Sequence, residues 1–322
     1  MTNIVNIVAQ KQAIALLEGA ITANRIAPAY LFAGSPGVGR GLVARWFIER
    51  LFCQDIPPQQ QPLLKKRLQQ GNHPDLLWIE PTYLHNGIRL SAKEAAEKGL
   101  KRKTPPQIRL EQIREISQFL GRSPLEASRQ IVVLEQAETM AESAANGLLK
   151  TLEEPGNATL ILIAPSPDAL LPTLVSRCQR IPFYRLAQDD MAQVLQQTGY
   201  EQILQEPSIL AIAQGSPGEA IAAFEQLQAI PPELLAKLNQ LPNSSRMALE
   251  LAKEIDQTLD PQAQLWLVDY LQHSYWQHQS HTQIIHQLEQ ARTYLLGYAQ
   301  PRLVWEVTLL ECHTKLRSIM SF

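Results

Sequence analysis

The stretch between residues 29 and 52 constrains the fold of this 322-residue chain most, because three patterns follow one another there. Residues 29 to 33 form a short apolar run, which is typical of a buried parallel strand. A glycine-rich segment covers residues 34 to 41, and residues 42 to 52 then carry a broad apolar face at helical spacing. A strand, a glycine loop and a helix in this order are the setting of a phosphate-binding loop. Several further strands separated by helices predict an α/β fold with a mainly parallel, covered sheet.

The glycine-rich segment departs from a working phosphate-binding loop at two positions. The working pattern is G-x-x-x-x-G-K-[ST], in which the Lys reaches phosphate oxygens and the hydroxyl holds Mg²⁺. Arg40 stands at the Lys position and Gly41 at the hydroxyl position, while the glycines Gly34, Gly37 and Gly39 are present. Arg is a planar fork that does not reproduce a compact ammonium group, and Gly offers no metal ligand. These five residues are therefore the candidate phosphate-contacting residues of a degenerate site, and a simple strand-to-helix turn is the alternative.

A working loop also needs an acidic strand end that positions Mg²⁺ and polarises water. The apolar strand expected at residues 130 to 134 runs into Glu135, but Gln136 and Ala137 stand where a catalytic acid would follow. Glu135 occupies the place of a metal-binding Asp. A solvated carboxylate that caps the next helix is the simpler interpretation of both Glu135 and Glu138. Two independent parts of the hydrolytic machinery are thus missing, which predicts an NTPase scaffold without its own NTPase.

Composition excludes several classes of protein. The chain has 29 Lys and Arg against 31 Asp and Glu, so no overall basic field indicates direct binding to nucleic acid. The three cysteines are far apart and form no C-x-x-C pair, which argues against a disulfide framework or a zinc site; they are Cys53, Cys178 and Cys312. We expect a soluble cytoplasmic protein, because the sequence has neither a signal pattern nor an apolar run of spanning length.

Strand patterns end near residue 186, and the rest of the chain reads as helical. We therefore expect three parts: an α/β domain over residues 1–185, a small helical lid over 186–230 and an all-α C-terminal domain over 231–322. Residues 85 to 106 form a charged insert that we expect to be exposed. The remaining strands are expected at residues 76–81, 160–164 and 181–183.

Four segments together resemble the clamp-loader AAA+ subunits of bacterial DNA polymerase III. They are Gly71 to Leu76, Ala144 to Pro155, Ser176 to Cys178, and the strand that precedes the glycine loop. The defective loop is similar to that of the delta-prime members of this family rather than the ATP-hydrolysing gamma/tau motor. The resemblance covers nearly all of residues 8 to 220, and from residue 231 onward it rests on helical character and position only.

The resemblance implies an AAA+ P-loop domain, a lid and a C-terminal collar, which assemble with gamma/tau-like motor subunits and a delta-like subunit into a hetero-pentamer. Such a complex places a sliding clamp on primed DNA. The arginine of the Ser-Arg-Cys segment projects into a neighbour's ATP site, which implies a catalytic role in trans for Arg177. From the residues alone, an ion-paired surface Arg is the simpler interpretation. In the lid, Gly218 stands where motor subunits carry a nucleotide-sensing Arg.

The expected cofactors follow from the same resemblance. No cofactor is expected in the chain's own site, and ATP with Mg²⁺ is expected in the neighbouring subunit. Family members commonly carry a four-cysteine zinc module after the loop helix, of which only Cys53 is present, so we expect no zinc.

Other interpretations remain open at this point. The chain is an ATP-hydrolysing gamma/tau-like motor or another AAA+ ATPase if Arg40 replaces the Lys and Glu135 holds Mg²⁺. The loop still binds nucleotide without hydrolysis if its backbone donors suffice. The basic residues of the insert form a solvated loop or contact DNA phosphates; they are Lys98, Lys101, Arg102 and Lys103. A nucleotidyl-transfer site requires paired metal-binding carboxylates, and nothing in the sequence resembles such a pair. No membrane partner is expected.

Overall fold

The computed structural model describes residues 7–54, 56–98, 105–238, 241–279 and 282–320. The chain divides into two compact units, Met1–Leu186 and Ala187–Phe322. The first boundary lies next to the one expected from the end of the strand patterns. The expected division of the second part near residue 230 stays a prediction.

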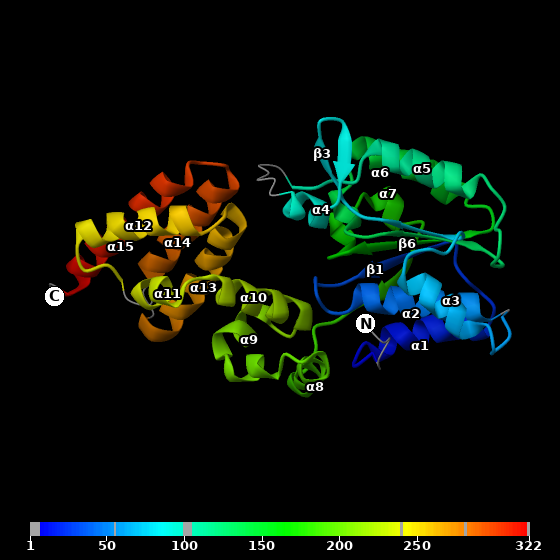
Figure 1. Cartoon of the computed structure of the whole chain (residues 1–322), viewed down its shortest axis with the longest axis horizontal. Helices are drawn as coiled ribbons and strands as arrows, with labels where there is room; N and C mark the ends of the chain where they lie inside the picture. The colour runs from blue at the N-terminus through cyan, green and yellow to red at the C-terminus, as the bar shows by residue number, and fades with distance from the viewer. Residues whose placement is uncertain (1–6, 55, 99–104, 239–240, 280–281, 321–322) are drawn as a thin grey trace. The chain divides into compact units, whose positions relative to one another are not determined.

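The first unit is built on a five-stranded parallel sheet with the order β2-β5-β6-β1-β7 (Figure 1). All five strands were expected from the sequence, and the mainly parallel sheet is confirmed. Their bounds are β1 Ala29–Ala33, β2 Leu76–Ile79, β5 Gln130–Leu134, β6 Ala158–Ala164 and β7 Gln179–Pro182.

The sheet is covered on both faces, which explains why its central strands read as continuous apolar runs. Every residue of β5 and β6 is buried. In Figure 1, α5, α6 and α7 lie on one side of the sheet, and α1, α2 and α3 lie on the other. These helices are α1 Lys11–Thr22, α2 Arg40–Cys53, α3 Gln61–Gln69, α5 Leu110–Leu120, α6 Glu142–Glu153 and α7 Pro172–Val175.

The first helix is shorter than the sequence pattern suggested. Apolar positions recur at helical spacing from residue 4 to residue 23, but α1 begins at Lys11, and residues 1–6 lie outside the described part. Ala9 and Gln10 both have positive φ, 64° and 53°, which is incompatible with a right-handed helix. The side chain of Gln10 donates hydrogen bonds to the carbonyls of Val38 and Tyr184, and these tertiary contacts override the helical pattern.

The charged insert contains regular structure that the sequence analysis missed. An antiparallel hairpin leads into a short helix: β3 Tyr83–His85, β4 Ile88–Leu90 and α4 Ala92–Glu97. Asn86 and Gly87 form its turn with φ of 50° and 78°, as a two-residue hairpin turn of type I′ requires. Leu90 and Ala95 are buried, so the insert is not the wholly exposed excursion that was expected. The basic residues Lys101, Arg102 and Lys103 lie outside the described residues.

The second unit contains helices and, within its described residues, no strand. Its longer helices are α8 Gln188–Thr198, α10 Pro217–Ala229, α12 Ser245–Thr258, α13 Pro261–Gln279, α14 Thr282–Leu296 and α15 Pro301–Met320. Its shorter ones are η3 Glu201–Gln205, α9 Pro207–Ala213 and α11 Pro232–Leu238. A core that runs from Ile230 to Cys312 joins α11 to α15 around the buried Trp305, whose indole N–H donates to Gln264 Oε1 (2.9 Å).

None of the described helices is both long enough and apolar enough to cross a membrane.

Candidate functional site

The glycine loop leaves the carboxyl end of β1 and leads directly into α2. The backbone N–H of Gly34 donates to the carbonyl of Ala164 (3.2 Å), and that of Phe183 donates to the carbonyl of Ala33 (2.7 Å). A Cβ at residue 34 would lie 2.5 Å from the backbone oxygen of Phe183, so only glycine fits this close approach. The loop therefore keeps the backbone shape that the sequence pattern predicted.

The other loop glycines lie where the chain turns into the helix. Gly37 and Gly39 have φ of 74° and 98°, the left-handed region that favours glycine. Gly39 is the residue that precedes α2, and Arg40 and Gly41 are the first two residues of the helix. All five candidate loop residues are thus brought together at one end of the sheet.

Gln10, which was not expected from the sequence, joins this loop to the segment that follows the last strand. Its side-chain amide donates to the carbonyls of Val38 (3.1 Å) and Tyr184 (2.7 Å), and its amide oxygen accepts from the backbone N–H of Tyr184 (3.2 Å). The residue is only 8% exposed. Because these bonds join segments up to 174 residues apart, no local pattern marks Gln10 in the sequence.

Gly41 stands beside the acidic strand end, as the phosphate-loop interpretation predicts. A Cβ at residue 41 would lie 3.8 Å from Oε1 of Glu135, which is ordinary van der Waals contact. A Ser or Thr hydroxyl at this position would therefore lie next to the carboxylate that follows β5, the arrangement that holds Mg²⁺ in a working site. Glycine supplies no hydroxyl, so one ligand of that arrangement is missing.

Glu135 is held by a neighbour rather than exposed as a helix cap. The indole N–H of Trp78 donates to Glu135 Oε2 (2.8 Å), and the guanidinium of Arg45 lies over the Trp78 ring, 4.2 Å from its centre. Since α6 begins after Ala141 and has no side-chain cap, the predicted capping role of Glu135 is wrong.

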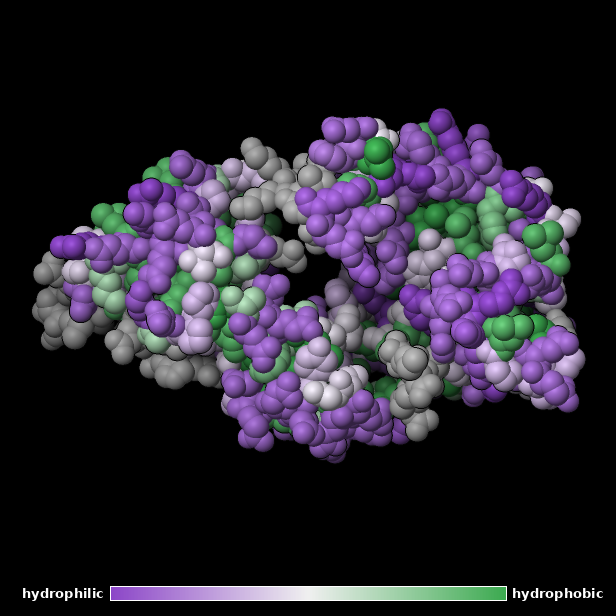
Figure 2. All heavy atoms as spheres, in the orientation of Figure 1, coloured by the Kyte–Doolittle hydropathy of each residue, from purple (hydrophilic) through white to green (hydrophobic). Residues whose placement is uncertain are grey.

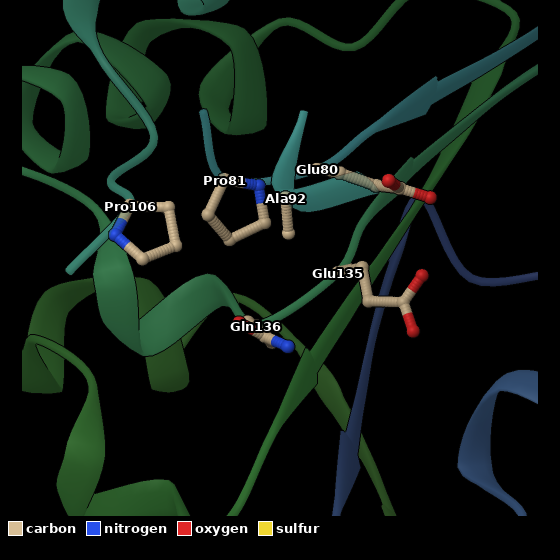
Figure 3. Close-up of a pocket in the computed structure, with 6 residues that line it drawn as sticks. All are labelled: Glu80, Pro81, Ala92, Pro106, Glu135 and Gln136. Carbon is tan, nitrogen blue, oxygen red and sulfur yellow. The ribbon is translucent and has the colours of Figure 1, made fainter. Parts of the chain in front are cut away.

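A small pocket of about 190 Å³ opens beside Glu135. Its remaining lining residues come from the end of β2, the insert and the start of the next turn: Glu80, Pro81, Ala92, Pro106 and Gln136. In Figure 3 the carboxylates of Glu80 and Glu135 extend away from the two prolines. Gln136, at the position of the missing catalytic acid, is exposed and has φ of 49°.

Glu138 is half-buried in the short turn η1 (Ala137–Thr139), so it too is not the solvated cap that was expected. Burial raises the pKa of its carboxyl, and the positive charge of Arg40 pulls that pKa downward. Arg40 is itself only 9% exposed. The charge at the Lys position therefore acts on a carboxylate of its own chain.

Arg177 lies between α7 and β7 and is exposed. Its Nη1 donates to the carbonyl of Thr173 (3.0 Å), and its Nη2 donates to Oε1 of Glu153 (2.9 Å), at the end of α6. The side chain is 38% exposed. An ion-paired surface Arg was the simpler interpretation from the residues alone, and this geometry fits it while leaving the guanidinium accessible to an anion.

Arg177 and the glycine loop lie at opposite ends of the sheet. In the parallel pair β1–β7, Tyr30 lies opposite Gln179, and the loop starts four residues after Tyr30. Arg177 precedes Gln179 by two residues. At about 3.3 Å per residue, roughly 13 Å of strand separates the start of the loop from the level of Gln179. Arg177 therefore does not face the phosphate loop of its own chain.

The Gly71 to Leu76 segment has a structural role at the same end of the sheet as Arg177. The carboxylate of Asp75 accepts three backbone hydrogen bonds, from Leu125 (2.7 Å), Glu126 (2.7 Å) and Ala127 (2.8 Å). Burial raises the pKa of Asp75, but these three bonds outweigh it and leave the pKa below its ordinary value. His73 Nδ1 accepts from the backbone N–H of Asp75 (3.2 Å), and burial lowers the pKa of His73.

The cysteines form neither a disulfide nor a metal site in the described residues. Cys312 is buried and Cys53 and Cys178 are half-buried, and burial raises the pKa of Cys178 to about 11 and that of Cys312 to about 12. Among the residues that the structure describes, no three His, Cys, Asp or Glu side chains are placed to hold a metal ion. The expectation that the chain holds no zinc stays a prediction.

Gly218 is the second residue of α10, in the second unit. Ser216 precedes the helix, and its hydroxyl accepts from the backbone N–H of Glu219 (3.3 Å). The segment thus forms an ordinary capped helix start, with glycine at the second helical position.

Family models match both units of the chain. Residues 9–187 match the model described as DNA polymerase III, delta subunit. Residues 189–312 match the model described as cyanobacterial DNA polymerase III delta prime, C-terminal domain. The two matches meet at the boundary between the two units, and the second covers the region where the sequence pattern alone was least specific.

Relatives among known proteins agree with these models. DNA polymerase III subunit delta' of Bacillus subtilis is 33% identical over 180 residues, 55% of this chain and 48% of that protein. The same subunit of Pseudomonas aeruginosa is 36% identical over 156 residues, 47% of this chain and 42% of that protein. The match thus spans about half the length of these relatives.

A solved structure shows the same fold. A DNA polymerase III gamma subunit-related protein from Thermotoga maritima superposes with a TM-score of 0.54 at 19% identity and covers 94% of this chain and 99% of that one. The expected fold class, an α/β domain with a parallel sheet followed by a helical region, is thereby confirmed.

Proposed function

Because the chain belongs to the delta-prime family of DNA polymerase III clamp-loader subunits, we propose that it is a non-hydrolysing member of a clamp loader. In this role it completes the ATP site of a neighbouring gamma/tau-like motor subunit with Arg177. The assembly, which also contains a delta-like subunit, places a sliding clamp on primed DNA in the cytoplasm.

The placement of Arg177 at the end of the sheet away from the glycine loop carries the proposal. An arginine so placed has no phosphate of its own chain to act on, yet it is exposed and its planar fork suits transferring phosphoryl oxygens. The degenerate loop supports the same division of roles, since Gly41 lacks the metal ligand and Trp78 occupies one oxygen of Glu135.

The chemistry asked of this chain is electrostatic. When a neighbour holds ATP and Mg²⁺, negative charge on the transferring phosphoryl group is stabilised by the guanidinium of Arg177. An arginine supplied in trans is worth roughly 10³–10⁵ in rate in comparable phosphoryl-transfer systems. No proton transfer is required of this chain, and no zinc or nucleotide of its own.

The second unit offers a surface suited to assembly. Five exposed large apolar side chains lie in a short stretch across the end of α14 and the start of α15: Tyr294, Leu296, Tyr298, Leu303 and Val307. Several exposed large apolar side chains within one short stretch of sequence suit a protein–protein contact. This stretch supports the proposed collar role of the C-terminal helices.

The test is reconstitution of the loader with motor and delta-like subunits from the same organism. With Arg177→Ala, we expect the DNA-stimulated ATPase to fall sharply at the site that this residue completes, while the complex elutes intact from a sizing column. Arg180→Ala, a neighbouring exposed arginine on β7, is the matched control and should hydrolyse ATP at the wild-type rate. An unchanged rate with Arg177→Ala contradicts the proposed role.

The retained loop backbone favours one alternative, a motor that hydrolyses ATP in its own site. If this alternative holds, the purified chain alone hydrolyses ATP, and Arg40→Ala abolishes that hydrolysis. We expect no turnover by the chain alone, because Gly41 and Gln136 both lack the groups required.

A further inference from the structure

We propose that Glu153 is a positioning residue for Arg177: it fixes the guanidinium at the surface so that its remaining donors face an incoming phosphate. This inference rests on the proposed function, because it concerns the same arginine. It adds a second residue, on a different helix, to the in-trans machinery.

Two hydrogen bonds hold the guanidinium through two different nitrogens. Thr173 in α7 accepts from Nη1 at 3.0 Å, and Glu153 at the end of α6 accepts from Nη2 at 2.9 Å. Each bond takes one N–H from a different nitrogen, so the plane of the guanidinium is fixed while other N–H groups stay available. One carbonyl alone would leave this plane free to rotate.

The two supports are anchored in the core of the first unit. On α6, Leu148 and Leu152 are fully or largely buried, and on α7 the same holds for Leu174 and Val175. Both helices belong to the same hydrophobic cluster. Glu153 is therefore an exposed side chain on a rigid support, which is what a positioning residue needs.

The exposure of the pair separates positioning from folding. The two side chains are 38% and 54% exposed, and an ion pair this accessible contributes little to stability in water. A long arginine side chain, in contrast, loses much rotational freedom when it is fixed. Orientation before docking removes part of that cost from the catalytic step.

The experiment uses the reconstituted loader with full-length chain, and measures DNA-stimulated ATP hydrolysis over a range of ATP concentrations. For Glu153→Ala we expect kcat to fall about tenfold with KM nearly unchanged, because misorientation affects the transition state most. Glu153→Gln keeps an oxygen that accepts the Nη2 hydrogen bond and should recover most of the rate. Glu154→Ala, the adjacent exposed carboxylate, controls for loss of local negative charge and should match wild type.

A double-variant cycle separates this inference from the proposed function. If Glu153 acts through Arg177, adding Glu153→Ala to Arg177→Ala changes the rate no further. A normal rate for Arg177→Ala overturns the proposed function itself. A reduced rate for Arg177→Ala together with a normal or raised rate for Glu153→Ala overturns only the positioning role. An equal loss in both arginine backgrounds, or a lower melting temperature of Glu153→Ala, assigns Glu153 a structural role and also overturns it.

Discussion

The two ends of the parallel sheet carry side chains in opposite states. At the carboxyl ends of the strands, the glycine loop keeps its backbone, but Trp78 holds Glu135 and the charge of Arg40 acts on Glu138. At the amino ends, Arg177 is exposed and donates hydrogen bonds to Thr173 and Glu153. One end resembles a binding site whose charged groups have partners within the chain, and the other presents a charged group to the surroundings.

In this chain the shape of the phosphate-loop motif and its chemistry depend on different residues. The shape of the loop depends on the close approach of Gly34 to Phe183 and on the amide of Gln10, both of which are present. The chemistry depends on residues 40, 41 and 136, which do not supply an ammonium, a hydroxyl or an acid. The loop therefore persists as a packing element of the first unit.

The largest effect is expected from a substitution of Arg177, at the amino ends of the strands. Arg177→Lys keeps the charge but not the planar fork, and we expect the rate at the completed ATP site to fall on the order of 10²-fold or more. The measurement is DNA-stimulated ATP hydrolysis by the reconstituted loader. A lysine variant as fast as wild type would show that charge alone suffices.

The same end of the sheet should depend on Asp75 for stability. Asp75→Ala leaves three backbone N–H groups without their acceptor, and we expect a loss on the order of 3 kcal/mol in the free energy of unfolding. Chemical denaturation at pH 7 measures it. Asp168→Ala, an exposed carboxylate in a surface turn, is the control and should change stability little.

Asp75 and His73 also predict a pH dependence. The folded pKa of each lies below its ordinary value, so each contributes stability that is present above the ordinary pKa and lost as the pH falls below it. The wild-type melting temperature should decline below about pH 6.5 as His73 becomes protonated, and again below about pH 4 as Asp75 does. In Asp75→Ala the second decline should be weaker. A decline of equal size in that variant would exclude Asp75 as its cause.

The loop end should tolerate no side chain at its closest contact. Gly34→Ala places a Cβ 2.5 Å from the carbonyl oxygen of Phe183, and we expect about 1–3 kcal/mol of destabilisation. Gly19→Ala is the matched control, because nothing lies within 4 Å of a Cβ in that helical position, and it should stabilise the chain slightly. Thermal unfolding of both variants checks the pair, and equal melting temperatures contradict the packing role of the loop.

The smallest change is expected in nucleotide affinity when the side chains of a working phosphate loop are partly restored. Arg40→Lys with Gly41→Thr returns the ammonium and places a hydroxyl beside Glu135, and we expect nucleotide affinity with Mg²⁺ to rise about tenfold. Hydrolysis should stay absent, because Gln136 is unchanged. Titration calorimetry with a non-hydrolysable ATP analogue measures the affinity, and a Mg²⁺-independent gain would indicate that the hydroxyl does not act as a metal ligand.

The sequence was sufficient to predict the sheet because its strands are short apolar runs between helical patterns. The loop residues Gly34 to Gly41 are contiguous, so their position between a strand and a helix could also be read from the sequence, while their role as phosphate contacts stays a prediction. The hairpin in the insert was missed although Asn86-Gly87 is a strong local turn signal. That signal is present in the sequence, but the charged composition of the insert favoured an exposed excursion.

The partners of the functional side chains were beyond prediction for a physical reason. Trp78 and Glu135 are 57 residues apart, and Glu153 and Arg177 are 24 apart, so their contacts exist only after the sheet has assembled. The same holds for Gln10. The proposed role of Arg177 came from a family resemblance, and local chemistry alone favoured a surface ion pair.

Because the glycine loop and Arg177 lie at opposite ends of the sheet, each fold of this kind has two different ends. The loop end can receive an arginine from a neighbour, and the arginine end can supply one. On the proposed function, a row of such subunits would place the arginine end of one member against the loop end of the next. A subunit with an inactive loop does not interrupt the row if it is the last member, because no neighbour then supplies an arginine to its loop. On the proposed function, the geometry of this chain thus suits the terminal position of an ordered row and would interrupt one at any interior position.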